Sequence, residues 1–428
     1  MKFDVQHSTK SPDLPFDIIA LIIDTVGEYN DTNLLKELAL VSYSFLQICT
    51  KHLFATVDLH DAFPEHHVAS SKKGFVKLLK SRPDVVKYIR NLTYKVTPRS
   101  KLYPTSDNDD DLLLPILPNF LRTISRLNYL KINASRLHWD EINSSLTSAL
   151  LHLMHLPTIN HIDLSSIKNF PLSSLTASVN LRRLDIFYLT HFDPDGDDSF
   201  GTVQSETMPN IREFHISESD LVTTKLLRAK RQDGRSAFNF MDLRRLSISS
   251  IWFEDEWDIR YLLQNAKLLE NLHLSLAGLS IRPSRILVGF QDIISLCART
   301  LKVLELTVAY DMWCYVFIEA LCKEMEAMAE YNMLETLSLE VHVRGFEIED
   351  FIGSIIRKVD MVLVKAGWSA LRQVSFKFLF DCWSREVSRE NIAKVSERLQ
   401  YVPDKYLNLS KFEIVVINST TFVVKCKF

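Results

Sequence analysis

Hydrophobic residues recur in a six-residue pattern through most of the chain. The pattern, apolar-x-x-apolar-x-apolar, occurs ten times between residues 89 and 376, at spacings of 22 to 38 residues. Its last three positions alternate apolar and polar, which is typical of a strand because successive strand side chains point to opposite faces. The pattern therefore predicts ten short strands. The copies begin at Ile89, Leu127, Ile159, Leu181, Ile211, Leu243, Leu269, Leu301, Leu334 and Leu371.

Helical periodicity fills much of the sequence between these copies. Stretches with helical spacing lie at residues 141–155, 284–298, 313–330, 347–366 and 388–400. Strand and helix thus alternate with a mean repeat of about 31 residues. This resembles the irregular members of the leucine-rich-repeat class and implies an α/β solenoid with parallel strands on the concave face and helices on the convex face. The alternative is a compact α/β domain whose strands merely share a pattern.

The amino-terminal residues 14–54 differ from the rest of the chain. Of these 41 residues 23 are hydrophobic, against 46% for the whole sequence, and their spacing predicts three short helices. Asp31 or Asn33 can cap the second helix and Ser42 the third. Three short helices cannot bury so many large side chains among themselves, so an apolar surface is expected to remain for a partner. The alternative is that the helices cap a larger core.

The order of residues in this segment resembles the F-box family. The matching elements are Leu14-Pro15-x-Asp17-Ile18-Ile19, Leu34-Leu35-x-x-Leu38, Leu40-Val41-Ser42-x-x-Phe45-x-x-Ile48 and Leu53-Phe54. The family binds a Skp1-type adaptor, and through it a cullin scaffold, by means of this module. The resemblance implies an adaptor-binding role for Leu14, Pro15, Ile18, Ile22, Leu35, Leu38, Val41 and Phe45.

The two resemblances together predict the domain organisation. An F-box domain is expected at residues 11–55, a linker at 56–73 and an irregular leucine-rich-repeat-like domain at 74–428. Alternating apolar residues in 411–428 predict a strand that closes the array.

Composition excludes several classes of function. The ten glycines never form GxGxxG or GxxxxGK[ST], and neither GxSxG nor HExxH occurs. The six cysteines form no CxxC, and the nearby His152, His155 and His161 have no cysteine or carboxylate companion at ligand spacing, so no metal site or cofactor is expected. A net charge of -3 offers no whole-chain attraction for nucleic acid or an anionic membrane. We therefore expect a protein that is not an enzyme.

The expected location is intracellular, cytoplasmic and/or nuclear. The first residues are polar and lack the apolar core of a signal peptide, and no uncharged apolar stretch reaches 18 residues.

The residue between the last two apolar anchors of each copy is expected to face away from the core. This column is polar and varied, which favours a protein ligand docking across it, with His161, His215 and His273 giving sensitivity to pH near 6. The alternative is ordinary solvated background. The expected substrate-binding residues are Asp163, Asp185, His215, His273 and Glu305.

An F-box joined to a solenoid resembles the substrate-recognition subunit of an SCF-type E3 ubiquitin ligase. The resemblance implies a non-catalytic receptor that holds a Skp1-type adaptor at one end and an unidentified target protein at the other. Two alternatives stay open: an F-box scaffold without ubiquitin transfer, and a repeat-based binding module outside any ligase.

Overall fold

The protein has an α/β fold built on one sheet. The computed structural model describes residues 15–29, 31–60, 71–96, 116–190, 208–231, 234–249, 256–276, 294–309, 314–329, 331–343, 355, 357–359, 361–363, 367–380, 412–418 and 421–427. Eleven strands, β1 to β11, form a parallel sheet in which neighbours in space are also neighbours in the sequence. The β12–β13 hairpin extends the sheet, with β13 antiparallel to β11.

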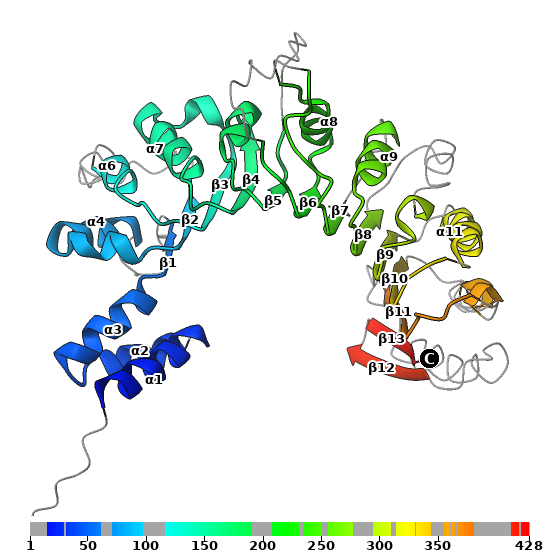
Figure 1. Ribbon diagram of the computed structural model, residues 1–428, viewed down its shortest axis with the longest axis horizontal. Helices are drawn as coiled ribbons and strands as arrows, with labels where there is room; N and C mark the ends of the chain where they lie inside the picture. Colours follow the sequence, from blue (N-terminus) through cyan, green and yellow to red (C-terminus); the bar gives the residue numbers. More distant parts are fainter. Residues whose placement is uncertain are drawn as a thin grey trace, which may run out of the picture. The chain divides into compact units, whose positions relative to one another are not determined.

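The ribbon drawing labels these elements along the chain (Figure 1). The strands are β1 (Thr56–Leu59), β2 (Asn91–Lys95), β3 (Tyr129–His138), β4 (His161–Lys168), β5 (Arg183–Phe187), β6 (Glu213–Ser217), β7 (Arg245–Ser249), β8 (Asn271–Leu276), β9 (Val303–Ala309), β10 (Thr336–Val343), β11 (Gln373–Phe380), β12 (Phe412–Asn418) and β13 (Thr421–Lys427). The α-helices are α1 (Phe16–Glu28), α2 (Thr32–Ala39), α3 (Tyr43–Leu53), α4 (Ser71–Ser81), α6 (Leu117–Leu121), α7 (Ser144–Met154), α8 (Asp220–Arg228), α9 (Glu256–Asn265) and α11 (Cys314–Met328). The 3-10 helices are η1 (Pro83–Tyr88), η2 (Trp139–Glu141), η3 (Leu172–Ala177) and η4 (Ser295–Cys297).

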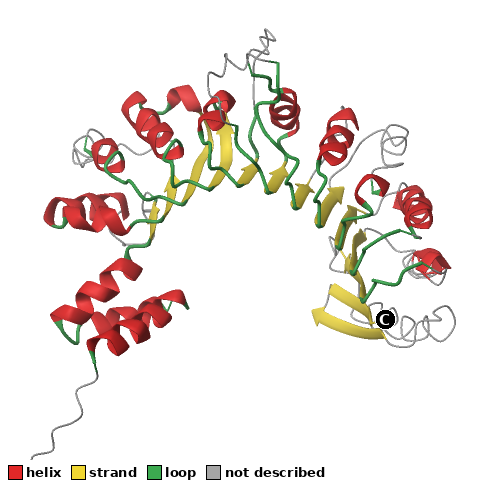
Figure 2. Ribbon diagram, viewed as in Figure 1, coloured by secondary structure: helices red, strands yellow, loops and turns green. Residues whose placement is uncertain are grey.

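The chain divides into two compact units. The first comprises Met1–Ser135 and Ile142–Ile159, and the second comprises Arg136–Glu141 and Asn160–Phe428. The first unit holds α1 to α3 followed by three strands with α4, α6 and α7. In the second unit the helices lie on one side of the strands (Figure 2). We call the opposite side of the second unit's sheet the open face.

All ten predicted strands are present. Each copy of the six-residue pattern contains a strand, from β2 for the first copy to β11 for the last. The anchors of every copy are buried, as Leu184 and Ile186 of β5 illustrate. The helices predicted at 141–155 and 313–330 are confirmed as α7 and α11. The helix predicted at 388–400 lies outside the described residues.

Two sequence predictions need correction. Residues Thr56–Leu59, assigned to a linker, form β1 and pair in parallel with β2, because Val57 and Leu59 bury on one face. The closing segment 411–428 was predicted as one strand and forms two, β12 and β13, joined as an antiparallel hairpin. For the helix predicted at 284–298, only its last part is described, and there Ser295–Cys297 forms a 3-10 turn.

One backbone carbonyl links each strand of the second unit to the next. The Asn160 carbonyl accepts the N–H groups of Arg182 (2.8 Å) and Arg183 (2.9 Å), and the Arg182 carbonyl accepts those of Arg212 (2.7 Å) and Glu213 (3.0 Å). The same pair of bonds recurs from strand to strand as far as β11. These bonds fix the start of each strand, so the register of the sheet is the same throughout.

Left-handed residues occupy the same position in three neighbouring copies of the pattern. Ser166 lies within β4, and Tyr188 and Glu218 directly follow β5 and β6; their φ values are 55°, 53° and 48°. Each follows a residue that is in register with the next strand. This conformation is costly for residues other than glycine. This energetic cost is offset here because the residue that follows each of the three turns back into the core and is buried.

A buried amide joins α11 to the segment before β11. The Asn332 side chain donates to the carbonyls of Ala329 (2.8 Å) and Gly367 (3.1 Å), and its oxygen accepts the N–H of Leu334 (3.2 Å). Gly367 has φ of +121°, and a Cβ at this position would overlap the Ala329 carbonyl oxygen. Glycine is therefore required at this close approach.

We expect Gly367→Ala to lower the free energy of unfolding by at least about 1–3 kcal/mol, because it adds both a strained φ and a steric clash. Gly74→Ala in α4 is the matched control, since no atom lies within 4 Å of a Cβ built there. Alanine favours a helix more than glycine does, so this control should be neutral or stabilising. Denaturant titration of both variants measures the difference, and equal stability would contradict the role given to Gly367.

Candidate functional site

Helices α1 to α3 form a small bundle, which we call the helical module. Asp31 caps α2 by accepting the N–H of Leu34 (3.0 Å), and Ser42 caps α3 by accepting that of Phe45 (3.3 Å). Ile23, Leu35 and Cys49 are fully buried at its centre. The partly buried residues around them are Ile19, Val26, Leu38, Ala39, Phe45, Ile48 and Leu53.

A cluster of polar contacts braces α1 against α3. Asp24 accepts hydrogen bonds from Lys51 (2.9 Å) and His52 (2.8 Å), and the His52 ring lies against Gly27 where any side chain would collide with it. Burial alone would raise the pKa of the Asp24 carboxyl, but the bonds from His52 and Lys51 outweigh it and lower that pKa. The module therefore has a defined geometry although its core is small.

The helical module leaves an unusual amount of apolar surface exposed. Ile18 is 44% exposed, Ile22 49% and Val41 65%. The other large apolar side chains exposed on the module are Phe16, Leu21, Tyr29, Leu34, Leu40 and Tyr43. An exposed apolar patch of this kind usually marks an interaction surface.

The residues predicted to bind an adaptor fall into separate groups. Pro15, Ile18, Ile22 and Val41 are exposed. Leu38 and Phe45 are partly buried and pack on the core. Leu14 lies outside the described residues. A direct contact role does not fit Leu35, which is 1% exposed and supports the surface from beneath.

The predicted polar column on the open face is aligned by the sheet register. Asp163 pairs with Asp185, Asp185 with His215, and His215 with Ser247. The series continues through His273, Glu305, Ser338 and Ser375. Residues that are 22 to 37 positions apart in the sequence thus lie about 4.8 Å apart across the strands.

Alignment does not make all of these side chains accessible. Asp163 and Asp185 are only 4% exposed, His215 and His273 are half-buried, and Glu305 is exposed. A partner can therefore reach Glu305 more readily than either aspartate. The alternation of side chains along a strand determines the face of the sheet on which a residue lies. The neighbouring side chains determine how exposed that residue is.

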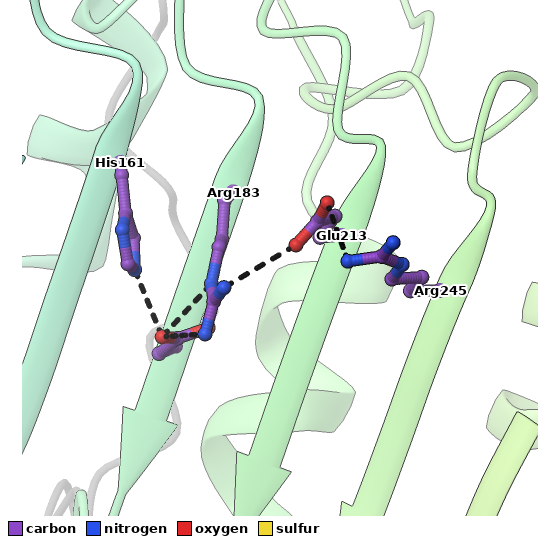
Figure 3. A network of polar contacts seen from close by, with 5 residues as sticks. His161, Arg183, Glu213 and Arg245 are labelled. Atoms are coloured by element: carbon purple, nitrogen blue, oxygen red, sulfur yellow. Dashed lines mark hydrogen bonds and ion pairs between the residues drawn. The ribbon is translucent and has the colours of Figure 1, made fainter. Parts of the chain in front are cut away.

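Asp185 is the centre of an ion-pair network on β4 to β7 (Figure 3). His161 Nε2 donates to its carboxylate (2.8 Å), and Arg183 donates from Nε and Nη2 (3.1 and 3.0 Å). Glu213 continues the network, with 3.4 Å to both Arg183 Nη1 and Arg245 Nη1. Burial would raise the pKa of the Asp185 carboxyl, but the bonds from His161 and Arg183 prevail and lower it.

The histidines of the column differ in their surroundings. Burial lowers the pKa of the His215 imidazole below its ordinary value of 6.5, and the Asp185 carboxylate opposes this only in part. His215 is therefore protonated at a lower pH than a free imidazole. His273 Nδ1 shares a hydrogen bond with Ser247 Oγ (3.0 Å).

A second polar cluster lies on β10 and β11. Lys377 Nζ donates to Glu340 Oε2 (2.7 Å) and His342 Nε2 to Glu340 Oε1 (2.9 Å). Burial raises the pKa of the Glu340 carboxyl, and the bonds from Lys377 and His342 more than reverse this effect. In both clusters a carboxylate lies between a histidine and a cationic side chain, and its pKa is lowered.

Sequence reasoning missed the arginines at the start of β5 to β7. They occupy the two x positions between the first anchors of their copies, as Leu181-Arg182-Arg183-Leu184, Ile211-Arg212-Glu213-Phe214 and Leu243-Arg244-Arg245-Leu246. The signal was visible as basic residues recurring at one position of consecutive copies. Only the final x position was used to predict binding residues.

Three cysteine thiols have surroundings that make them unreactive. Cys49, Cys297 and Cys322 are free and buried. Burial raises the pKa of Cys297 to about 12 and that of Cys322 to about 11. Such thiols stay protonated at neutral pH and are poor nucleophiles and poor metal ligands.

Comparisons with known proteins identify no family for this chain. No protein-family model matches the sequence, and no curated protein matches it. Within the described residues, no group of three or more His, Cys, Asp and Glu side chains could hold a metal ion. Over the same part of the chain, every helix is too short or too polar to cross a membrane.

We expect Asp185→Asn to lower the free energy of unfolding at pH 7 by about 3 kcal/mol, because it leaves Arg183 and His161 without their shared carboxylate. The pKa of Asp185 is lowered by folding, so its contribution is present above the ordinary value of 3.8 and is lost as the pH falls through the lowered value. The gap between wild type and variant should therefore close in that acid range.

Glu305→Gln is the control for this prediction, because Glu305 is an exposed carboxylate in the same column. Denaturant unfolding should show a change within about 0.5 kcal/mol for the control. A pH-independent gap for Asp185→Asn would contradict the electrostatic origin of its effect.

Proposed function

We propose that the chain is the substrate-recognition subunit of an SCF-type E3 ubiquitin ligase. In this proposal the helical module is an F-box that binds a Skp1-type adaptor, and through it a cullin scaffold. The remaining strands and helices form an irregular leucine-rich-repeat solenoid that binds a target protein.

The exposed apolar surface of the helical module carries the proposal. Burying Ile18, Ile22 and Val41 against a partner would stabilise a complex by several kcal/mol, since each large apolar side chain contributes roughly 1.5–3 kcal/mol on full burial. The order of apolar residues in α1 to α3 resembles an F-box, and the adaptor is the partner that this resemblance implies.

The solenoid interpretation is supported by the regular succession of strands. Each of β4 to β11 follows its neighbour in the sequence and pairs with it in parallel. In the second unit the helices occupy one side of the sheet, which leaves the open face for a ligand (Figure 2). Tandem repeats commonly use such an extended surface for binding.

A receptor of this kind would act by positioning. Holding a target near a ubiquitin-charged enzyme raises the effective concentration of its lysine at the thioester, without a catalytic group in this chain.

We expect the double variant Ile18→Ser/Ile22→Ser to weaken co-purification with a Skp1-type adaptor by about tenfold or more, because it removes two exposed apolar contacts. Met241→Ser is the control, since Met241 is 57% exposed but lies in the second unit. Quantitative pull-down compares the three proteins. Equal adaptor binding by all of them would reject the proposed interface.

Leu35→Ala should act differently, through folding. Removing a fully buried leucine costs about 2–5 kcal/mol, so thermal unfolding of the module should occur at lower temperature. The Ile18→Ser/Ile22→Ser protein should keep its unfolding temperature because both side chains are exposed. An unchanged unfolding temperature for Leu35→Ala would contradict the placement of this residue in the core.

Reconstitution with adaptor, cullin and a charged ubiquitin-conjugating enzyme then separates the ligase from an F-box scaffold. Ubiquitin transfer to a captured protein supports the ligase. Adaptor binding without transfer to any captured protein would favour the scaffold.

A further inference from the structure

The amino-terminal edge of β5 to β7 carries a dense group of arginines. We call this group the arginine edge; it consists of Arg182, Arg183, Arg212, Arg244 and Arg245. Arg183 and Arg245 occupy one register position on either side of Glu213. The other three members precede the same strands by one residue.

The backbone of the arginine edge is held in place before any ligand arrives. The Arg182 carbonyl accepts the N–H of Arg212 (2.7 Å), and the Arg212 carbonyl accepts those of Arg244 (2.8 Å) and Arg245 (3.1 Å). The arginines of neighbouring strands are thus about 4.8 Å apart at the backbone. Only the side chains would need to be ordered on binding.

The cationic groups are more accessible than the acids among them. The side chains of Arg244 and Arg245 are 54% and 56% exposed, whereas those of Glu213 and Asp185 are 28% and 5% exposed. Asp185 pairs closely with Arg183 (3.0 Å), and Glu213 makes longer ion pairs with Arg183 and Arg245 (3.4 Å each). These acids are less exposed than the arginines that they contact.

Several guanidinium donors have no acceptor among the described residues. Each guanidinium carries five N–H donors, and Arg245 uses Nη1 for a 3.4 Å contact with Glu213. Arg244 pairs at 3.5 Å with Glu270, which Lys302 also approaches at 3.6 Å. The Arg212 side chain is exposed and makes no hydrogen bond or ion pair with any described residue.

We propose that the arginine edge binds an acidic, carboxylate-rich segment of the target protein. This inference rests on the proposed function and names the class of target that it would recognise. Glutamate and aspartate side chains match the planar guanidinium in bidentate geometry. Phosphate accepts the same bidentate bonds, so a phosphorylated segment is tested below as the competing ligand.

Nucleic acid fits this surface less well. Glu213 separates Arg183 from Arg245, and the row formed by Arg182, Arg212 and Arg244 ends at Glu270 before β8, so the basic surface is short. The whole chain carries a net charge of -3, which gives no long-range attraction for a polyanion.

The test uses the full chain and a fluorescein-labelled Glu-rich peptide, with fluorescence anisotropy as the readout. The wild type should bind this peptide at least about tenfold more tightly than the same peptide with Gln in place of Glu. The variant Arg212→Glu/Arg244→Glu should lose about tenfold or more in affinity, and Arg212→Gln should lose less. Raising the salt concentration should weaken wild-type binding, because the guanidinium groups are exposed.

Lys267→Glu/Lys323→Glu is the matched control, because it makes the same change of charge at two other exposed positions. It should bind the Glu-rich peptide like the wild type. Equal loss in both double variants would overturn the proposal by showing a general charge effect. Tighter binding of a phosphoserine peptide or of a single-stranded oligonucleotide would also overturn it.

One further measurement completes the test. Adaptor co-purification separates this inference from the proposed function. Arg212→Glu/Arg244→Glu should retain the adaptor, and Ile18→Ser/Ile22→Ser should retain the peptide.

Discussion

The hydrogen bonds between the start of one strand and the start of the next set the geometry of the second unit. The Arg182 carbonyl receives two N–H groups from the following strand, and the same arrangement recurs through β11. The apolar anchors on one face of each strand, such as the buried Leu184 and Ile186, then have to lie in the core. A shift of one residue would expose these anchors, so the register is held by backbone and core together.

Because the register is fixed, residues from successive repeats form one continuous surface. Residues from different copies, such as Asp185 and His215, become neighbours across the open face. The surface is polar, and its charged groups neutralise one another in two clusters, one centred on Asp185 and one on Glu340. Such a surface can select a partner by charge and geometry more than by apolar burial.

The helical module differs from this charged surface because its exposed surface is apolar. Its core of Ile23, Leu35 and Cys49 is too small to cover the remaining apolar side chains, so Ile22 and Val41 stay in water. Contact with another protein would remove this surface from water. The two surfaces of the chain thus suit two kinds of partner, one bound by hydrophobic burial and one by charge.

The sequence by itself determined strands β2 to β11, the three amino-terminal helices and the alignment of the polar column, because these depend on local periodicity and on caps such as Asp31 and Ser42. It did not determine exposure: the pattern predicts that Asp163 and Asp185 bind a partner, but both are buried. Exposure depends on side chains from other strands, such as Arg183 and His161, which only the tertiary structure brings together. The arginine edge likewise exists only once the strands are side by side, since its members come from separate copies of the pattern.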